Sequence, residues 1–413
     1  MEVLLLALCG VARAHIDPDD PDHSPQEFFS RPSPPPPARD PDIYGGLYDG
    51  IVTWKNDSNP ITVMCTVVIK EQLYVEPGAV IRVRPNCSDV DARRWGMSNP
   101  GGVGALPSII ILPGASIHAV GTPELPIVFM KDGSHSSDAE PNSRGDWGGI
   151  LLLGSARVSQ VDTPGNLTET MPTDIFPPCH DMPDDPSEPP HLPRCEKVTG
   201  ASGASLEYGG DDDEGSCGRM EHVIVLNAGG SDNATDASAV GVFACGHRTR
   251  LSRVEVAHSA GNGVTFRGGT AFASDLAVWN AAKDGVRASN GYRGLMKRVF
   301  VNTPTNGRSS LRAEGTWGGS GNDTTTYRTH PVVYGATLVA DAAPTGPDGN
   351  LGIVDVALGS GITLANSIVF STSNRTFGVR VSRCSSNMIV GHADAIGAPD
   401  AGPEISTSHD RGF

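Results

Sequence analysis

The sequence predicts an all-β solenoid, and three observations lead to this fold class. The 413 residues include 50 Gly and only 6% aromatic residues, which suits many short strands joined by tight turns. The segment "RVEVAHSAGNGVTFRGG" from Arg253 aligns with "DLAVWNAAKDGVRASNG" from Asp275, an offset of 22 residues. Each unit contains two or three short apolar strands with Gly/Asn turns. Such a period indicates coils that bury their apolar faces on their neighbours.

The N-terminal residues predict export. Residues 1–14, "MEVLLLALCGVARA", have a short apolar core and end at a small-residue site, as a secretory signal does, although Glu2 stands where a basic residue is expected. A lipoprotein signal ending at Cys9 is the alternative. Residues 15–45 are rich in Pro and Asp and predict a disordered linker. No later apolar run is long enough to cross a bilayer.

Residues 46–390 are predicted to form the solenoid, with about nine to eleven coils. Further copies of the repeat begin at His222, Arg298 and Gly361. Two Pro-Gly turns, Pro77-Gly78 and Pro113-Gly114, are expected to mark a longer-period pair near its start. Residues 160–200 are Pro-rich and predict a surface insertion without strands. Residues 391–413 predict a flexible tail.

Cysteines and glycosylation sequons agree with an extracellular location. Sequons of the form Asn-x-Ser/Thr mark a glycoprotein; they begin at Asn56, Asn86, Asn166, Asn233, Asn322 and Asn374. Local disulfides fit an oxidising compartment, and plausible pairs are Cys65–Cys87, Cys179–Cys195 and Cys217–Cys245, with Cys384 left over. The connectivity does not follow from the sequence. The net charge of −16 disfavours nucleic acid as a partner.

Several motifs resemble right-handed parallel β-helix proteins of the pectin-lyase-like superfamily, and in particular a secreted, surface-associated group best known from bacteria. The matching motifs are "LYVEPGAVIRV", "PELPIVF", "GDWGGILLLGSA", "EYGGDDDEGSCGRMEHVIV", "GVTFRGGT" and "DGVRASNGYRG". The resemblance covers about residues 50 to 390 and implies a single-stranded right-handed parallel β-helix. Relatives carry acidic pairs where this chain has Gly261-Asn262 and Lys283-Asp284, so a cation site of the relatives does not transfer directly.

The acidic run Asp211, Asp212, Asp213 and Glu214 is a candidate Ca²⁺ site, because Ca²⁺ prefers carboxylate oxygens. The alternative is a solvated acidic turn, which is the usual role of a charge run. No EF-hand or Gly-Asp repeat fixes a ligand geometry in this run. Calcium is therefore the one cofactor that the sequence suggests.

A pectate-lyase type of reaction would need Ca²⁺ and a basic side chain that removes a proton next to a uronate carboxylate. The candidate bases are Arg267, Arg287 and Arg298, and the candidate calcium ligands are Asp275 and Asp284. The repeat alignment places Thr265 near Arg287 and Asn262 near Asp284. One Asp per coil without a stacked carboxylate cluster is, however, usually a turn residue, and no convincing carboxylate pair for a glycosidase is found.

Two further groups of residues bear on function. Asn227, His258 and Asn280 share one repeat position and are predicted to form a ladder at a coil corner, in which His258 is a structural variant. Sugar-stacking aromatic residues, if exposed, are Trp147, Trp279, Tyr292 and Trp317.

The leading hypothesis is a secreted, non-enzymatic β-helix that serves as a structural, adhesion or glycan-binding platform. Its partner would be an extracellular polysaccharide or a cell-surface or matrix protein. The alternatives are a Ca²⁺-dependent polysaccharide lyase or other glycan-acting enzyme, and a surface lipoprotein.

Overall fold

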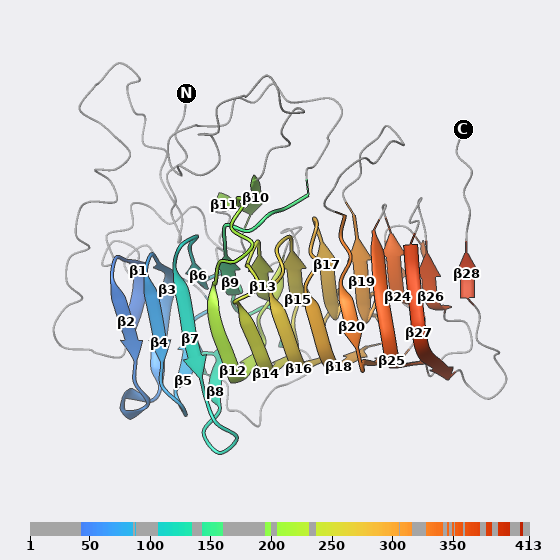
Figure 1. The fold of residues 1–413 in the computed structure, drawn as a ribbon. Helices are drawn as coiled ribbons and strands as arrows, with labels where there is room; N and C mark the ends of the chain where they lie inside the picture. The colour runs from blue at the N-terminus through green and yellow to red at the C-terminus, as the bar shows by residue number, and fades with distance from the viewer. Residues whose placement is uncertain are drawn as a thin grey trace, which may run out of the picture.

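The computed structural model describes residues 43–85, 87, 106–133, 143–159, 195–199, 205–230, 237–304, 306–315, 328–341, 345–346, 349–350, 352–357, 360–371, 377–381, 387–396 and 405–407. In this part of the chain nearly all regular structure is strand, and a single 3₁₀ turn lies at Asn56–Ser58. Strands of successive coils lie side by side along the molecule, from blue at the N-terminal end to red at the C-terminal end (Figure 1). The predicted parallel β-helix is confirmed.

Three parallel sheets, which we call A, B and C, form the walls of the solenoid. Sheet A contains β2 (Ile51–Trp54), β4 (Gln72–Val75), β7 (Ser116–Val120) and β20 (Val332–Tyr334). Sheet B contains β5 (Val80–Val83), β8 (Ile127–Lys131) and β21 (Thr337–Ala340). Long strands cross from sheet A into sheet B: β12 (Gly218–Leu226), β14 (Arg250–Ala257), β16 (Phe272–Trp279), β18 (Leu295–Thr303), β25 (Gly361–Ser371) and β27 (Asn387–Ile396).

Sheet C continues each coil after sheet B. It contains β6 (Ser108–Ile111), β9 (Gly149–Leu153), β13 (Ser238–Phe243), β15 (Asn262–Arg267), β17 (Val286–Ser289), β19 (Leu311–Glu314), β24 (Gly352–Ala357), β26 (Phe377–Val381) and β28 (Ile405–Thr407). The first coils use β1 (Ile43–Tyr48) and β3 (Ile61–Ile69), which pair in sheet B with their first residues and in sheet C with their last.

The register of β14 and β16 confirms the 22-residue repeat. Val254 lies opposite Leu276 and Val256 opposite Val278, and in sheet C Val264 lies opposite Val286. All of these apolar side chains are buried in one continuous core inside the solenoid. Because side chains alternate along a strand, the residues between them face outward and make up the surface of the sheets.

A left-handed residue makes the corner between sheets A and B within β12, β14, β16, β18 and β25. Arg253, Asp275 and Arg298 each have φ of 53° at this corner. One residue in this conformation turns the chain while the strands on both sides continue. A second corner, after sheet B, is made by Asn227, His258 and Asn280, with φ between 57° and 58°.

The two Pro-Gly turns do not form the expected longer-period pair. Leu73 of β4 lies opposite Ile117 of β7, so Pro77-Gly78 follows a strand of sheet A, whereas Pro113-Gly114 precedes one. The prediction was wrong because the same turn chemistry serves two different corners. The glycines of both turns have positive φ, 81° at Gly78 and 85° at Gly114.

The strands extend beyond the predicted domain limits. β1 begins at Ile43 rather than at residue 46, and the predicted tail 391–413 contains the end of β27 and the whole of β28. The insertion 160–200 was predicted to contain no strands, but its last residues form β10 (Cys195–Thr199). This strand pairs antiparallel with β11 (Ser205–Gly209), which follows the insertion, and both lie outside the solenoid wall (Figure 1). A further small antiparallel pair joins β22 (Thr345–Gly346) and β23 (Gly349–Asn350).

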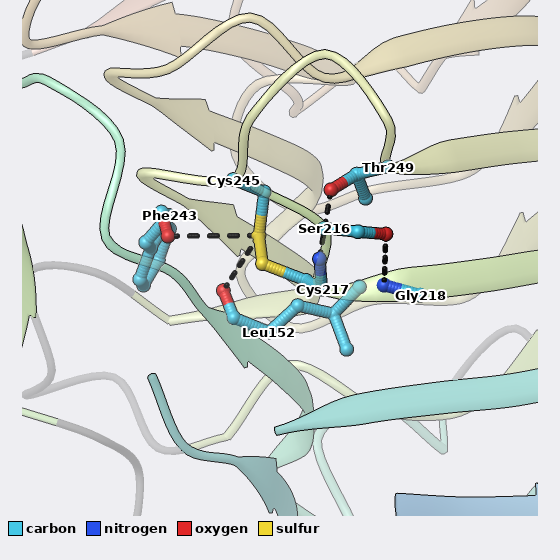
Figure 2. Close-up of a disulfide and its surroundings, with 7 residues drawn as sticks. All are labelled: Leu152, Ser216, Cys217, Gly218, Phe243, Cys245 and Thr249. Carbon is cyan, nitrogen blue, oxygen red and sulfur yellow. Dashed lines mark hydrogen bonds between the residues drawn. A yellow bond between two sulfur atoms is a disulfide. The ribbon is translucent and has the colours of Figure 1, made fainter. Parts of the chain in front are cut away.

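Two of the predicted disulfides are confirmed, Cys65–Cys87 and Cys217–Cys245. Cys217 precedes β12 and Cys245 follows β13, so the second bond ties together two neighbouring coils at one corner. Figure 2 shows this bond beside Thr249, whose Oγ1 accepts a hydrogen bond from the Cys217 amide at 2.9 Å. Cys245 Sγ lies 3.6 Å from the Leu152 carbonyl oxygen; a disulfide sulfur carries no hydrogen, so this is a packing contact.

Candidate functional site

A groove of about 630 Å³ lies on the outer face of sheet B. Its floor is apolar, because Val128, Ile224 and Leu226 face outward there and pack with their neighbours. Polar side chains complete the lining; they are Glu255, His258, Asn280, Asn302 and Asp341. An apolar floor with a few convergent polar groups is the usual composition of a small-molecule or sugar site.

Trp279 stands at the edge of this groove as its one large aromatic lining residue. Its side chain is 40% exposed, and its ring lies 4.5 Å from that of Phe300, centroid to centroid. The contact with Phe300 holds the indole in place while one surface stays open to solvent. Register places Trp279 between Ala257 and Asn302 of the neighbouring coils, and small Ala257 leaves room over the indole.

A chain of hydrogen bonds fixes the polar end of the groove. Arg144 Nη2 donates to Asn280 Oδ1, which orients the Asn280 amide so that its Nδ2 donates to His258 Nδ1 at 2.8 Å. The accepting nitrogen must then be unprotonated. Burial, and to a lesser extent the Arg144 charge, accordingly lower the pKa of His258.

The predicted corner ladder is therefore formed in part. Asn227, His258 and Asn280 do share one position, and His258 and Asn280 are bonded to each other. Asn227 instead donates to the Ser143 carbonyl oxygen. His258 acts in the corner as a structural acceptor, as predicted, but it also lines the groove.

A second polar cluster lies on the outer face of sheet C. One outward row is apolar in the first coils, at Val68, Ile110 and Leu151, and becomes charged in the later ones. The later members face each other across four successive strands in the order Arg287, Arg312, Asp355 and Arg380. Glu314, in the adjacent outward row, pairs with both Arg287 and Arg312.

The pKa values of the two carboxyl groups in this cluster are shifted in opposite directions. Burial raises the pKa of Asp355 despite Arg312 and Arg380 beside it. Burial alone would also raise the pKa of Glu314, but Arg287 and Arg312 offset this effect and leave the pKa lowered. Asp355 is 1% exposed, and neither of its carboxylate oxygens accepts a hydrogen bond from the described residues; its ion pairs measure 3.6 and 3.8 Å.

The three candidate bases do not meet in one place. Arg267 and Arg287 face outward on sheet C, where Arg267 lies over the Phe243 ring at 5.7 Å and Arg287 pairs with Glu314. Arg298 lies at the corner between sheets A and B and pairs with Asp275 through two nitrogens. Asp275 raises the pKa of Arg298, which is opposite to what a proton-abstracting base requires.

The candidate calcium ligands are also dispersed. Asp284 is fully buried, accepts a hydrogen bond from the Ser309 amide at 3.2 Å, and has a pKa raised by burial; as the repeat alignment predicts, it lies beside Asn262, whose Oδ1 accepts from the Asp284 amide at 3.1 Å. Among the described residues no three His, Cys, Asp or Glu side chains gather as a metal site. Calcium binding stays a prediction.

The acidic run Asp211–Glu214 forms a turn that backbone amides and basic side chains anchor. Asp213 Oδ1 accepts a hydrogen bond from the Arg157 amide at 3.0 Å, and the Asp213 carbonyl accepts from the His247 amide at 2.9 Å. Glu214 lies 3.4 Å from His247 and 3.8 Å from Arg248. These contacts favour the turn over the calcium site.

Several other predicted residues can be placed, and some cannot. Of the predicted sugar-stacking aromatic residues, Trp147 and Tyr292 are buried, and Trp279 is the one that the described structure shows exposed. Asn56 is exposed in its 3₁₀ turn. The remaining sequons (Asn86, Asn166, Asn233, Asn322, Asn374), Trp317, Cys179 and Cys384 lie outside the described residues, as does the side chain of Cys195.

Sequence reasoning missed Arg144, Glu314, Arg312, Asp355 and Arg380. The available signal was a charged residue between apolar ones in "LRAE", "IVDVA" and "GVRV". Their convergence was hidden because the coils differ in length. Arg287 and Arg312 are 25 residues apart, whereas Arg312 and Asp355 are 43 apart (355 minus 312).

Comparison with known families identifies the fold independently. Residues 194–396 match the family model described as a pectate-lyase like beta helix domain. The predicted resemblance is thus confirmed for this part of the chain. A comparison with curated proteins found no match. In the described residues no helix has the length and apolar character needed to cross a membrane.

Two solved structures are similar at low identity. Full-length tailspike protein 2 from Escherichia coli O157:H7 bacteriophage CAB120 has a TM-score of 0.31 at 7% identity, over 83% of this chain and 35% of that one. The tailspike receptor binding domain of siphovirus 9NA has a TM-score of 0.26 at 10% identity, over 89% of this chain and 74% of that one. The chain therefore spans about a third of the length of the first.

Proposed function

From the β-helix domain that residues 194–396 match, we propose that this protein is an extracellular glycan-binding platform whose sugar lies in the groove on sheet B. The observation that carries the proposal is the exposed Trp279, held by Phe300 above an apolar floor and next to imidazole, amide and carboxylate groups. Sugar rings have apolar faces and polar edges, so an aromatic face beside hydrogen-bonding groups suits them.

Export supports the same proposal. The signal-like residues 1–14, the sequons and the two disulfides all fit an oxidising extracellular location. Expression in a secreting eukaryotic cell should yield a protein that begins at His15 and loses mass on treatment with an N-glycosidase. Expression in a bacterium that instead yields an N-terminus at a lipid-modified Cys9 would support the surface lipoprotein.

The groove is tested by binding to an array of neutral and acidic oligosaccharides, followed by calorimetry with the sugars that bind. Trp279→Ala should weaken binding by roughly tenfold or more, the usual effect of removing an anchoring Trp. Tyr334→Ala is the matched control, because Tyr334 is an aromatic residue of similar exposure, 48%, on sheet A. Equal affinities of Trp279→Ala and the unmodified protein would contradict the groove as the site.

A glycan-cleaving enzyme is the second candidate, and the sheet C cluster favours it. Glu314 and Asp355 lie on paired strands and have pKa values pushed in opposite directions, as an acid and a base would. Uronate absorbance with Ca²⁺ or chelator would report a lyase, and reducing-sugar release a hydrolase. If the protein has such an activity and Glu314→Gln or Arg287→Ala abolishes it, the protein is an enzyme and not only a binding platform.

A further inference from the structure

The hydrogen bonds of Arg144, Asn280 and His258 at the corner beside the groove have a fixed direction. An arginine side chain can only donate, so the atom of Asn280 that meets Arg144 must be the acceptor Oδ1. The other end of the same amide, Nδ2, then has to face His258 Nδ1, which lies 2.8 Å away. The chain of bonds is therefore complete only while this ring nitrogen carries no proton.

Protonation of His258 leaves these side chains without a satisfactory arrangement. The new N–H group on Nδ1 would point at the N–H groups of Asn280. Rotation of the Asn280 amide would turn its oxygen toward His258, but it would place the amide donors against the Arg144 guanidinium. Because opposed, unpaired donors are costly in a half-buried site, one of the side chains must leave the corner.

The surrounding charges determine where a protonated ring would move. Charged side chains stand around His258 on several segments; they are Arg144 and Asp146, Lys131 of β8, Glu255 of β14 and Asp341. Lys131 and Asp146 pair with each other at 3.1 Å, and Arg144 repels a positive ring. The last two carboxylates line the groove, so an imidazolium gains energy by moving away from the corner and into the groove.

Such a movement would change the groove without separating the coils. The side chains of His258 and Asn280 both belong to its lining. The backbone beneath them is held from coil to coil, because the His258 amide donates to the Trp279 carbonyl oxygen and the Asn280 amide to the Asn302 carbonyl oxygen, both at 3.0 Å. The side chains can therefore swing while the strands keep their register.

We propose that Arg144, Asn280 and His258 form a latch that holds the polar end of the groove closed near neutral pH and opens in mild acid. In the open state the imidazolium lies in the groove beside its carboxylates, where it occupies space that a ligand needs. A sugar held at Trp279 is then released as the pH falls. This release rests on the proposed function, whereas the latch itself depends only on the three side chains.

The latch is tested first without any sugar, by NMR of the isotope-labelled full chain. Correlations between the ring nitrogens and the carbon-bound ring protons report the tautomer and the pKa of each histidine, and the signal that is missing in His258→Asn belongs to His258. We expect the neutral ring to carry its proton on Nε2 and to titrate below its ordinary pKa of about 6.5. A neutral ring with its proton on Nδ1 would overturn the latch.

Two substitutions test the partners of the latch in the same spectra. Arg144→Gln should raise the pKa of His258, because it removes a positive charge and lets the Asn280 amide rotate. A pKa that this substitution leaves unchanged would overturn the latch. Glu255→Gln should lower the pKa of His258, because it removes a carboxylate that attracts the open ring. Glu221→Gln is the matched control, since Glu221 pairs with arginines at another corner, and it should leave this pKa unchanged.

Release is tested by calorimetry with the tightest-binding oligosaccharide of the array, at about pH 7.5 and about pH 5.5. The affinity of the unmodified protein should fall by about threefold or more in acid, and that of His258→Asn should not. His330→Asn is the matched control, because burial also lowers the pKa of His330 although its ring lies beside Thr363 and outside the groove. This variant should retain the fall. Thermal unfolding verifies the fold of each variant.

The outcomes separate the latch from the proposed function. An affinity that does not change with pH, or one that falls equally in His258→Asn, would overturn the release while the groove stays a sugar site. Absence of any bound sugar near neutral pH would reject the proposed function and the release with it. The NMR titration needs no sugar, so it would still decide whether the latch exists.

Discussion

His258 shows how one residue can serve both the corner and the groove. A left-handed corner tolerates Asn well, and Asn stands at this position in the coils before and after it. Histidine can accept the hydrogen bond from Asn280 only when its Nδ1 is unprotonated. Because protonation of His258 removes this hydrogen bond and its pKa is lowered, the stability of the corner depends on pH.

We predict that His258→Asn removes a pH-dependent loss of stability. A histidine whose folded pKa is lowered contributes fully to stability above its unfolded pKa of about 6.5, and the contribution falls as pH decreases below that value. The Asn variant can still accept from Asn280 through its own Oδ1. The melting temperatures of both proteins should agree near pH 7.5 and diverge toward pH 5, where the variant is more stable. Parallel pH profiles would contradict the role given to His258.

At the scale of the element, the Gly residues of the repeat are explained by contacts between coils. Gly263 and Gly285 occupy equivalent positions, as the sequence alignment indicates. A Cβ on Gly285 would lie 2.8 Å from the Ser310 carbonyl oxygen and would also clash with Val301. The repeat therefore retains Gly where the backbone of the next coil comes close.

Gly285→Ala should lower the free energy of unfolding by about 1–3 kcal/mol through this overpacking. Gly378→Ala is the matched control, because a Cβ there would meet nothing within 4 Å. It should change stability by less than about 0.5 kcal/mol. Denaturant midpoints of the two variants measure the difference. Equal midpoints would show that the coils can separate enough to accept a methyl group.

At the scale of the whole molecule, stability depends on how neighbouring coils are held in register. Cys217 and Cys245 are both buried in the core and join two coils across 28 residues. A cross-link that closes a loop of this length restricts the unfolded chain. The lost chain entropy should stabilise the folded protein by roughly 3.5 kcal/mol.

The double substitution Cys217→Ala/Cys245→Ala should therefore lower the free energy of unfolding by about 2–4 kcal/mol. Denaturant unfolding of the variant and of the unmodified protein, both without reductant, provides the measurement. Adding reductant should lower the free energy of unfolding more in the unmodified protein than in the variant, because the variant already lacks this disulfide. A variant as stable as the unmodified protein would indicate that coil packing alone sets the register.

Local pattern by itself predicted the solenoid and the 22-residue repeat around Arg253 and Asp275, and it suggested two disulfide pairs that the structure then confirmed. These depend on neighbours within one coil or the next, and strand alternation and turn chemistry record such neighbours directly. Trp279 could also be named as a sugar-stacking candidate, since an aromatic residue at an outward position is visible in the sequence.

Only the tertiary structure decided which outward residues meet. Arg287, Arg312, Asp355 and Arg380 come together although the residues between them differ in number from coil to coil, and the same holds for Tyr74, His118 and Arg219 on sheet A. The length of each inter-strand loop does not affect the register of the strands that it joins, because hydrogen bonds and the buried core set that register. Surface chemistry on a solenoid therefore follows the stacking of coils, which sequence distance does not encode.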